Sequence, residues 1–191
     1  MRLFLTCCFI GLLSIVSAQD HAENEFTREG FFFGAAAGVG ALQLSNSNGL
    51  AHNEVSMSFP NFKFGWMLSP RFAVEMCLPG SLYTFNAEGR SRSRGFEGMV
   101  PSVQYWLKNR WWISGGVGIG LDAPAFYDIK TETERKFYFG SAALFSTGYE
   151  VIRTRKFAID IQSRVHWGAM KIAEGNQNGT SFNFLIGINW Y

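Results

Sequence analysis

Hydrophobic residues alternate with small or polar residues along nearly the whole chain after Gly30. The most regular stretch is the last one, SFNFLIGINWY, which places Phe, Phe, Ile, Ile and Trp at every second position up to Trp190. Because successive side chains of a β-strand point to opposite faces, this period predicts strands with one apolar face. The opposite face of the last stretch carries Asn183, Gly187 and Asn189, which a core packed on both sides would not accept. The alternation therefore predicts an all-β fold whose sheet is apolar on one side only.

The alternating segments are joined in pairs by short basic turns. Three such units read NFKFGWML-SPR-FAVEMCL, PSVQYWL-KNR-WWISGGVGIGL and FSTGYEVI-RTRK-FAIDIQSRVHW. They recur about every 40 residues, a period that indicates a repeated architecture. Longer polar stretches lie between them: SNSNGLAHN, NAEGRSRSRG, DAPAFYDIKTETERK and AEGNQNGTS. We predict eight strands, with three short turns at one end and four longer loops at the other.

Alternating segments of about ten residues, separated by turns, are typical of a transmembrane β-barrel. Hydrocarbon cannot satisfy free backbone N–H and C=O groups, so a sheet in a bilayer must close on itself. We therefore predict an eight-stranded antiparallel up-and-down transmembrane β-barrel over residues 30–191, with its apolar face toward lipid and both termini on the periplasmic side. Aromatic residues beside the short turns are expected to form a girdle at the membrane interface: Trp66, Tyr105, Trp111, Tyr149, Phe157, Trp190 and Tyr191.

The N-terminal residues predict export. Arg2 precedes an apolar run from Leu3 to Ile15, and small residues follow up to Ala18. Residues 1–18 thus have the features of a secretory signal peptide cleaved after Ala18. The apolar run is shorter than the about 20 residues that a membrane-spanning helix needs. Residues 19–29 are polar and aperiodic, and we expect them to form a flexible periplasmic segment.

Composition excludes several classes of function. A net charge of +2 offers no electrostatic basis for binding nucleic acid. After cleavage Cys77 is the only cysteine, so no internal disulfide is expected, and the three scattered histidines predict no metal site. The GGVGIG stretch lacks the following helix and the Lys-Ser/Thr pair of a phosphate-binding loop. The sequence predicts no metal and no other cofactor.

Polar residues on the inner face are expected to fill the bore, because small barrels pack their interiors with side chains. The alternation places these residues there: Lys63, Glu75, Gln104, Glu150, Asp160, Gln162, Arg164 and His166. Buried charges are expected to find partners, so we predict that Lys63 pairs with Glu75, and that Arg164 pairs with Asp160 or Glu150. A proton or ion path through these residues is the alternative to a purely structural network.

The hairpins GWMLSPRFAVE, QYWLKNRWWISGG and GYEVIRTRKFAID, together with the aromatic last strand, resemble the small eight-stranded outer-membrane proteins of Gram-negative bacteria, the OmpA/OmpX type. The resemblance covers residues 30–191. It implies a bacterial outer-membrane location, contact with membrane lipid and lipopolysaccharide, and recognition of the last strand by the barrel-insertion machinery. The residues implied in that signal are Phe184, Ile186, Ile188, Trp190 and Tyr191, although here the alternating set stops one residue before the last one.

The same resemblance bears on catalysis. Lipid-A deacylases of this type carry a histidine followed two positions later by a nucleophilic serine, whereas His166 is followed by Gly168. A histidine base without a hydroxyl has nothing to activate. We therefore predict no catalytic residue and a structural role for His166.

The stretch GRSRSRG places Arg90, Arg92 and Arg94 in a predicted extracellular loop. Arginine geometry suits phosphate groups, so contact with lipopolysaccharide is one interpretation and a solvated loop is the other.

Taken together, these features predict a non-enzymatic integral outer-membrane barrel with a filled lumen, which serves envelope structure or surface interaction through its loops. A narrow porin-like transporter or small-ligand barrel is the first alternative, and a lipid-A-modifying hydrolase is the second. A soluble lipocalin-like barrel, with its apolar residues facing inward around a ligand, is the third.

Overall fold

The computed structural model describes residues 26–46, 51–87, 90–125, 136–172 and 175–191. Every regular element in these ranges is a β-strand, and none of the described segments is a helix with the length and hydropathy needed to cross a bilayer. The strands are β1 (Gly30–Asn46), β2 (Ala51–Ser69), β3 (Phe72–Leu78), β4 (Gly80–Ala87), β5 (Arg90–Trp106), β6 (Trp111–Pro124), β7 (Tyr138–Arg153), β8 (Phe157–Ile172) and β9 (Gly175–Trp190).

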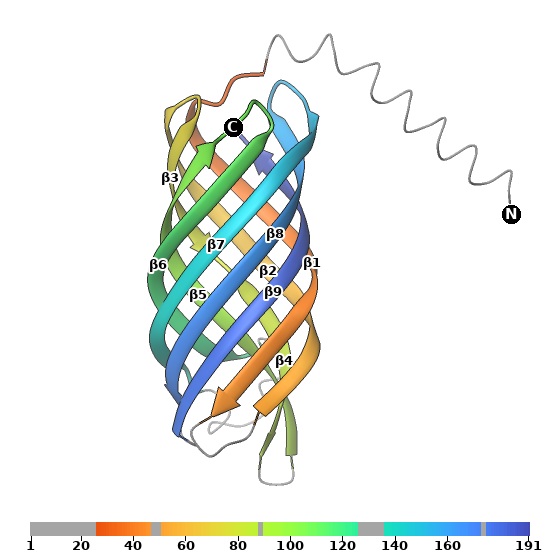
Figure 1. Ribbon diagram of the computed structural model, residues 1–191, viewed down its shortest axis with the longest axis vertical. Helices are drawn as coiled ribbons and strands as arrows, with labels where there is room; N and C mark the ends of the chain where they lie inside the picture. Colours follow the sequence, from red (N-terminus) through yellow and green to blue (C-terminus); the bar gives the residue numbers. More distant parts are fainter. Residues whose placement is uncertain (1–25, 47–50, 88–89, 126–135, 173–174) are drawn as a thin grey trace, which may run out of the picture.

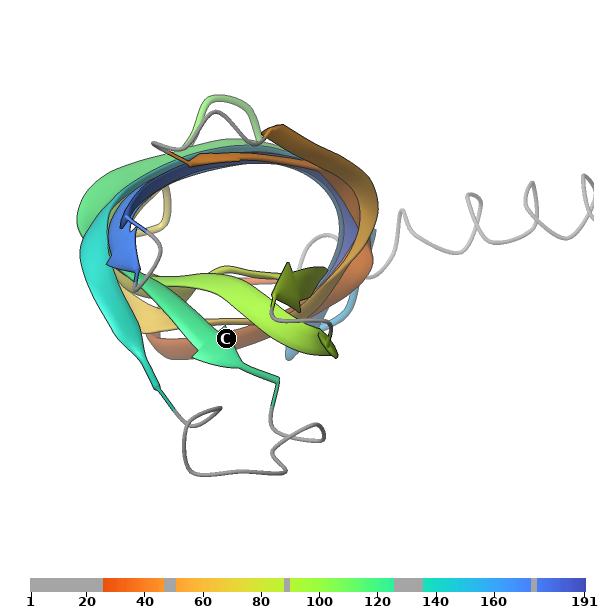
Figure 2. The same cartoon turned by 90° about the horizontal axis from the view of Figure 1, so that it is seen from below.

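The strands form one closed antiparallel ring (Figures 1 and 2). Around the ring the order is β3, β2, β1, β9, β8, β7, β6 and β5, and β5 pairs again with β3. The last strand closes on the first, with a register that runs from Phe33 opposite Trp190 to Asn46 opposite Gln177. β4 continues β3 beyond Pro79 and pairs with β5, so the wall has eight strand positions. The predicted eight-stranded fold is confirmed.

The apolar face of the sheet points outward. Phe64, Ile161 and Ile186 are 41%, 54% and 67% exposed. Inward-facing residues of β2 and β8, Lys63, Asp160 and Arg164, are only 4%, 0% and 4% exposed. This orientation confirms the predicted polarity of the sheet and rules out the lipocalin-like arrangement, which needs the apolar residues inside.

Part of the wall is held by side chains rather than by backbone pairing. Among the described residues, β4 has no backbone ladder with β2. Instead Ser56 Oγ donates to the Leu82 carbonyl at 2.6 Å and Ser58 Oγ donates to the Gly80 carbonyl at 2.8 Å. The Gly80 N–H donates in turn to Asn61 Oδ1 at 3.1 Å. These bonds satisfy backbone groups that a regular ladder would otherwise pair.

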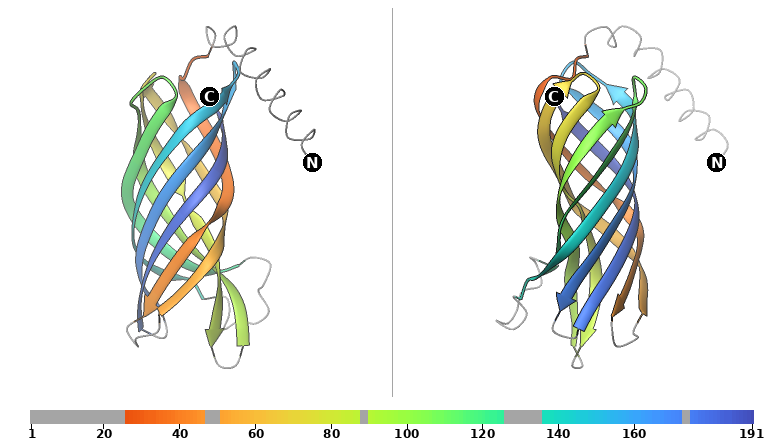
Figure 3. Two further views of the ribbon diagram at one scale, coloured as in Figure 1. Left: turned by 45° about the vertical axis from the view of Figure 1, so that its right-hand side comes forward. Right: turned by 60° about the vertical axis from the view of Figure 1, so that its left-hand side comes forward.

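The two ends of the barrel differ in construction. The C-terminus and the three short turns lie at one end, called the turn end below (Figure 1). At the other end, the loop end, β4 and β5 project from the rim (Figure 3). Strands here reach further than predicted, because β2, β5 and β9 begin at Ala51, Arg90 and Gly175, inside segments expected to be loops. Polar residues on the inner face of a strand make its sequence look like a loop, which explains this error.

Candidate functional site

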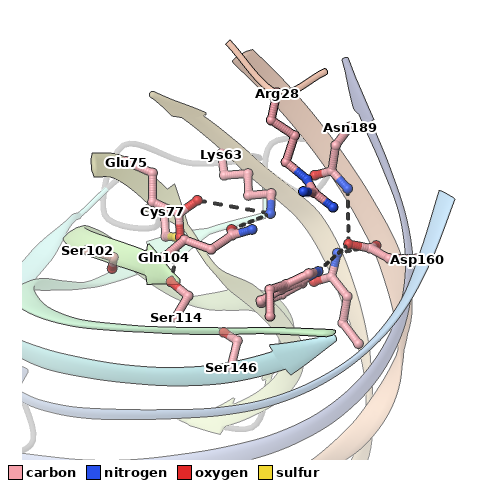
Figure 4. A network of polar contacts seen from close by, with 12 residues as sticks. Arg28, Lys63, Glu75, Cys77, Ser102, Gln104, Ser114, Ser146, Asp160 and Asn189 are labelled. Carbon is pink, nitrogen blue, oxygen red and sulfur yellow. Dashed lines mark hydrogen bonds and ion pairs between the residues drawn. The ribbon is translucent and has the colours of Figure 1, made fainter. Parts of the chain in front are cut away.

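The bore contains buried polar side chains, and the first group lies within a few residues of the short turns (Figure 4). Lys63 Nζ donates to Gln104 Oε1 at 2.8 Å and lies 4.0 Å from Glu75 Oε2. The other oxygen of Glu75 accepts bonds from the Ser114 hydroxyl and, at 3.3 Å, from Cys77 Sγ. The predicted ion pair between Lys63 and Glu75 is therefore present, at the long end of the range for such pairs.

The predicted pairing of Arg164 with a carboxylate is wrong. Within the described part of the chain, Arg164 donates to Asn61 Oδ1 at 2.7 Å and to Gln162 Oε1 at 3.2 Å, and no carboxylate oxygen forms an ion pair with it. Gln162 Nε2 donates to Asp160 Oδ1 at 2.8 Å, so the amide of Gln162 lies between the cation and the anion. The other oxygen of Asp160 accepts two bonds at 3.0 Å, from Trp112 Nε1 and Asn189 Nδ2.

A second group lies toward the loop end and centres on Asp122. Arg94 Nε donates to Asp122, Gln177 Nε2 donates to it at 2.9 Å, and the Tyr83 hydroxyl donates to it as well. The Arg94 guanidinium lies 5.4 Å from the centre of the Tyr138 ring. Arg94 was predicted to lie in an exposed loop, but it faces inward from β5 because the buried Asp122 carboxylate requires a cation.

The other two arginines of the predicted lipopolysaccharide contact lie at the beginning of β5. Arg90 and Arg92 pair through their backbones with Ala87 and Phe85 of β4. Their side chains lie outside the described part of the structure. They share the projecting hairpin of β4 and β5 at the loop end (Figure 3).

His166 is enclosed in the bore. Its ring lies 4.8 Å from the ring of Phe96, and neither ring nitrogen has a hydrogen-bond partner among the described residues. A Cβ atom at Gly168 would lie only 2.9 Å from Phe96 Cζ, so a serine at this position would not fit without a shift of that ring. Ser181 of β9 lies opposite His166 in the register and is buried, but its hydroxyl accepts a bond from Asn183 Nδ2 at 3.1 Å and makes none with the imidazole, so no described hydroxyl is paired with His166 as a nucleophile. The described residues also contain no group of three or more His, Cys, Asp or Glu side chains that could hold a metal ion.

A third group closes the turn end and is centred on Glu150. Glu150 Oε2 accepts bonds at 2.6 Å from both Arg28 and Arg153, and Oε1 accepts a bond at 2.9 Å from Trp106 Nε1. The Arg28 guanidinium lies 4.6 Å from the centre of the Trp106 ring and also donates to the Asn109 carbonyl at 2.6 Å. Arg28, Glu150 and Arg153 are all buried.

Two further aromatic residues complete this group. Tyr191 stacks on Phe32 at 5.8 Å between ring centres and meets Phe26 edge-on at 5.5 Å. Its hydroxyl lies 3.4 Å from Glu150 Oε1, and burial raises the pKa of Tyr191 well above its ordinary value of 10.0. We call this group of six residues the mouth cap: Phe26, Arg28, Trp106, Glu150, Arg153 and Tyr191.

The mouth cap corrects two predictions. Tyr191 was expected in the outer aromatic girdle, but it turns inward after β9 ends, while Trp190 points outward. Residues 26–29 were expected to be part of a flexible segment, but Arg28 is held between the turns by its bonds to Glu150 and to the Asn109 carbonyl. The rest of the predicted segment and the predicted signal peptide lie in residues 1–25, outside the described ranges.

The sequence contained a partial signal for the mouth cap. Trp106 follows the outward-facing Tyr105, so its inward position could have been read from the alternation. Arg28 lies in an aperiodic segment, and no sequence pattern marked it.

Among the described residues, the inward side chains pack closely around Lys63 and Arg164. A cleft bordered by Asn61, Lys63 and Arg164 has no room for a water molecule. A cavity of about 430 Å³ lies at the turn end beside the mouth cap, lined by Arg28, Met67 and Lys108 among others. At the level of this cleft, the described side chains leave no path for water along the bore.

The residues of the predicted insertion signal lie as the alternation requires. Phe184, Ile186 and Trp190 are exposed on the outer surface, and Ile188 is partly exposed between them.

Comparison with solved structures shows that this fold is that of small eight-stranded outer-membrane barrels. Two crystal structures of Ail, the attachment invasion locus protein of Yersinia pestis, match with TM-scores of 0.52 and 0.54 at 10% identity, covering 85% of this chain and 99% of Ail. One of them contains the heparin analogue sucrose octasulfate. Neisserial surface protein A matches with a TM-score of 0.51 at 17% identity, covering 84% of this chain and 96% of that protein. No protein-family model and no curated protein sequence matches the chain.

Proposed function

We propose that this protein is a non-enzymatic barrel of the bacterial outer membrane, which serves envelope structure or surface interaction at its loop end. The observation that carries the proposal is the inverted polarity of the sheet, with apolar residues outside and paired charges inside. An apolar outer surface is unfavourable in water but is stable in contact with the acyl chains of a bilayer. In the proposed membrane orientation, the turn end faces the periplasm and the loop end faces the outside of the cell.

The filled bore supports a closed barrel over a porin-like transporter. The mouth cap occupies the turn end, and the Lys63 and Asp160 groups lie next to it inside the bore. We expect no steady conductance in a planar bilayer. Stepwise current through the wild-type protein would favour the transporter instead.

The surroundings of His166 support a barrel without hydrolase activity. The mass of lipid A is expected to be the same in cells with and without the protein, and the same for His166→Ala. A loss of an acyl chain from lipid A that depends on His166 would overturn this part of the proposal.

At the loop end we propose that Arg90 and Arg92 contact anionic groups, such as the phosphates of lipopolysaccharide. Both residues lie on the projecting hairpin, and a guanidinium can donate two parallel hydrogen bonds to a phosphate. Arg94 is excluded from this contact because it is paired with Asp122. The structure of Ail with a sulfated sugar analogue is consistent with anion binding on this fold. We expect Arg90→Ser/Arg92→Ser to weaken binding to immobilised lipopolysaccharide, and Arg71→Ser at the turn end to leave it unchanged. Equal binding by both variants would refute the contact.

Location is tested on cells. The mature protein should fractionate with the outer membrane, begin at Gln19, and change its gel mobility when heated. Protease added to intact cells should cut near Arg90 and Arg92 and spare the turn end. Cleavage at the turn end in intact cells would reverse the proposed orientation.

A further inference from the structure

The outer surface carries a groove that the proposed function does not use. It has a volume of about 280 Å³ and crosses β6, β7, β8 and β9 close to the turn end. Its lining includes Trp111, Thr147, Tyr149, Ile161, Ser163 and Phe184.

The groove arises from a row of unequal side chains. Thr147 lies opposite Ser163 in the register of β7 and β8, and both point outward. The outward row on the turn side of this pair contains Tyr149 opposite Ile161, and the row on the loop side contains Phe145 opposite Val165. Two small residues between rows of larger ones leave a depression in the surface.

Trp111 fixes one wall of the groove. Its Nε1 donates to Thr147 Oγ1 at 2.7 Å, and Thr147 Oγ1 donates to the Trp112 carbonyl at 2.9 Å. The indole of Trp111 is thus held over β7 instead of rotating freely. Phe184 of β9 pairs with Ser163 and forms the opposite wall.

The groove begins at Trp111, the first residue of β6, and reaches Phe184 of β9, six residues before the end of that strand. Because the strands are tilted, a line parallel to the barrel axis that starts at the turn end crosses β6, β7, β8 and β9 in succession (Figure 1). The four strands contribute Trp111, Thr147, Ser163 and Phe184, and the last three are neighbours in the register of β7, β8 and β9. An acyl chain that stands upright in a bilayer could follow this path.

Basic turns lie at the end of the groove. The turn before β6 contains Lys108 and Arg110, and the turn before β8 contains Arg155 and Lys156. Neither turn contains an acidic residue, and Lys108, Arg155 and Lys156 are exposed. Arg110 donates to the Val151 carbonyl at 3.4 Å, which holds it next to the strand that carries Tyr149.

We propose that this groove binds one anionic phospholipid of the periplasmic leaflet, with an acyl chain between Trp111 and Phe184 and its phosphate beside the basic turns. The inference rests on the proposed membrane location. Charge favours a lipid over a second copy of the chain, because a second copy docked side by side would bring its own basic turns to the same height. Basic residues near an anionic headgroup layer attract it, and their loss weakens binding by about fivefold for each charge removed.

The test uses full-length protein purified from membranes in mild detergent. Native mass spectrometry counts bound phosphatidylglycerol, with phosphatidylcholine titrated in parallel as the uncharged comparison. We expect one phosphatidylglycerol on the wild type and its loss in Ser163→Leu, which fills the groove. The matched control is Ser141→Leu, an outward-facing position of β7 further from the turns, which should retain the lipid.

A second pair of variants tests the charge. Arg155→Ala/Lys156→Ala should reduce the preference for phosphatidylglycerol over phosphatidylcholine by roughly 25-fold, while Arg71→Ala on the turn between β2 and β3 should not. Unchanged lipid binding by Ser163→Leu, equal binding of both lipids by the wild type, or a dimer in place of the lipid would each overturn the proposal. Heat-modifiable migration after refolding into vesicles reports membrane insertion separately. Failure there contradicts the proposed function, whereas intact insertion without lipid binding contradicts the groove alone.

Discussion

Replacing Glu150 by glutamine should open the mouth cap. The substitution keeps the size of the side chain but removes the charge that two arginines share. Arg28 and Arg153 each lie 2.6 Å from Glu150 Oε2, and both guanidiniums are buried. The variant therefore leaves two buried cations without their carboxylate.

The size of the effect follows from these contacts. Removing one partner of a buried ion pair costs about 3–5 kcal/mol. Arg28 keeps its bond to the Asn109 carbonyl and its contact with the Trp106 ring, which favours the lower end of this range. We expect Glu150→Gln to lower the free energy of unfolding by about 3 kcal/mol. Arg28→Gln should cost less, about 2 kcal/mol, because Glu150 still has Arg153.

The assay is urea-induced unfolding of the barrel in phospholipid vesicles, followed by tryptophan fluorescence and by gel migration. Glu29→Gln is the matched control, because Glu29 lies one residue from Arg28 but is exposed. It should change stability by less than about 0.5 kcal/mol. If Glu150→Gln cost no more than Glu29→Gln, the mouth cap would not stabilise the barrel. If Arg28→Gln cost as much as Glu150→Gln, Glu150 would not be the centre of the group.

Three further outcomes are expected. Burial raises the pKa of Tyr191, so the stability contributed by the neutral phenol is complete below a pH of about 10 and is lost as the pH rises through the pKa of Tyr191 in the folded protein. In thermal unfolding, Tyr191→Phe should therefore lose less stability at alkaline pH than the wild type. An equal loss in both would contradict this assignment. Asp122→Asn leaves Arg94 buried without its carboxylate and should lower the free energy of unfolding by about 3 kcal/mol in the urea assay. The double variant Asp122→Asn/Arg94→Met should recover part of this stability. No recovery would show that loss of the ion pair is not the cause. Trp190→Ala should reduce assembly in cells but allow refolding into pure lipid vesicles, and an equal loss in both would indicate a fold defect instead of a lost insertion signal.

The alternation of side chains was enough to predict the wall of the barrel. A residue's parity in a strand decides which face it occupies, and this requires only local geometry. For this reason Lys63, Asp160 and Ile186 lie on the predicted faces. The short turns and the closing strand followed from the same pattern.

The contacts between inward residues across the bore could not be predicted from the alternation. Which inward residues meet depends on the stagger between strands and on the curvature of the closed sheet. Arg28 and Glu150 are 122 positions apart in the chain, and Arg164 meets Asn61, 103 positions away, instead of Asp160. Parity alone leaves all inward residues equivalent. Closure of the ring decides how far along the bore each residue lies and which residues it contacts. It also brings Arg28 and Tyr191, which lie outside the strands, into contact with the buried Glu150 carboxylate at the turn end.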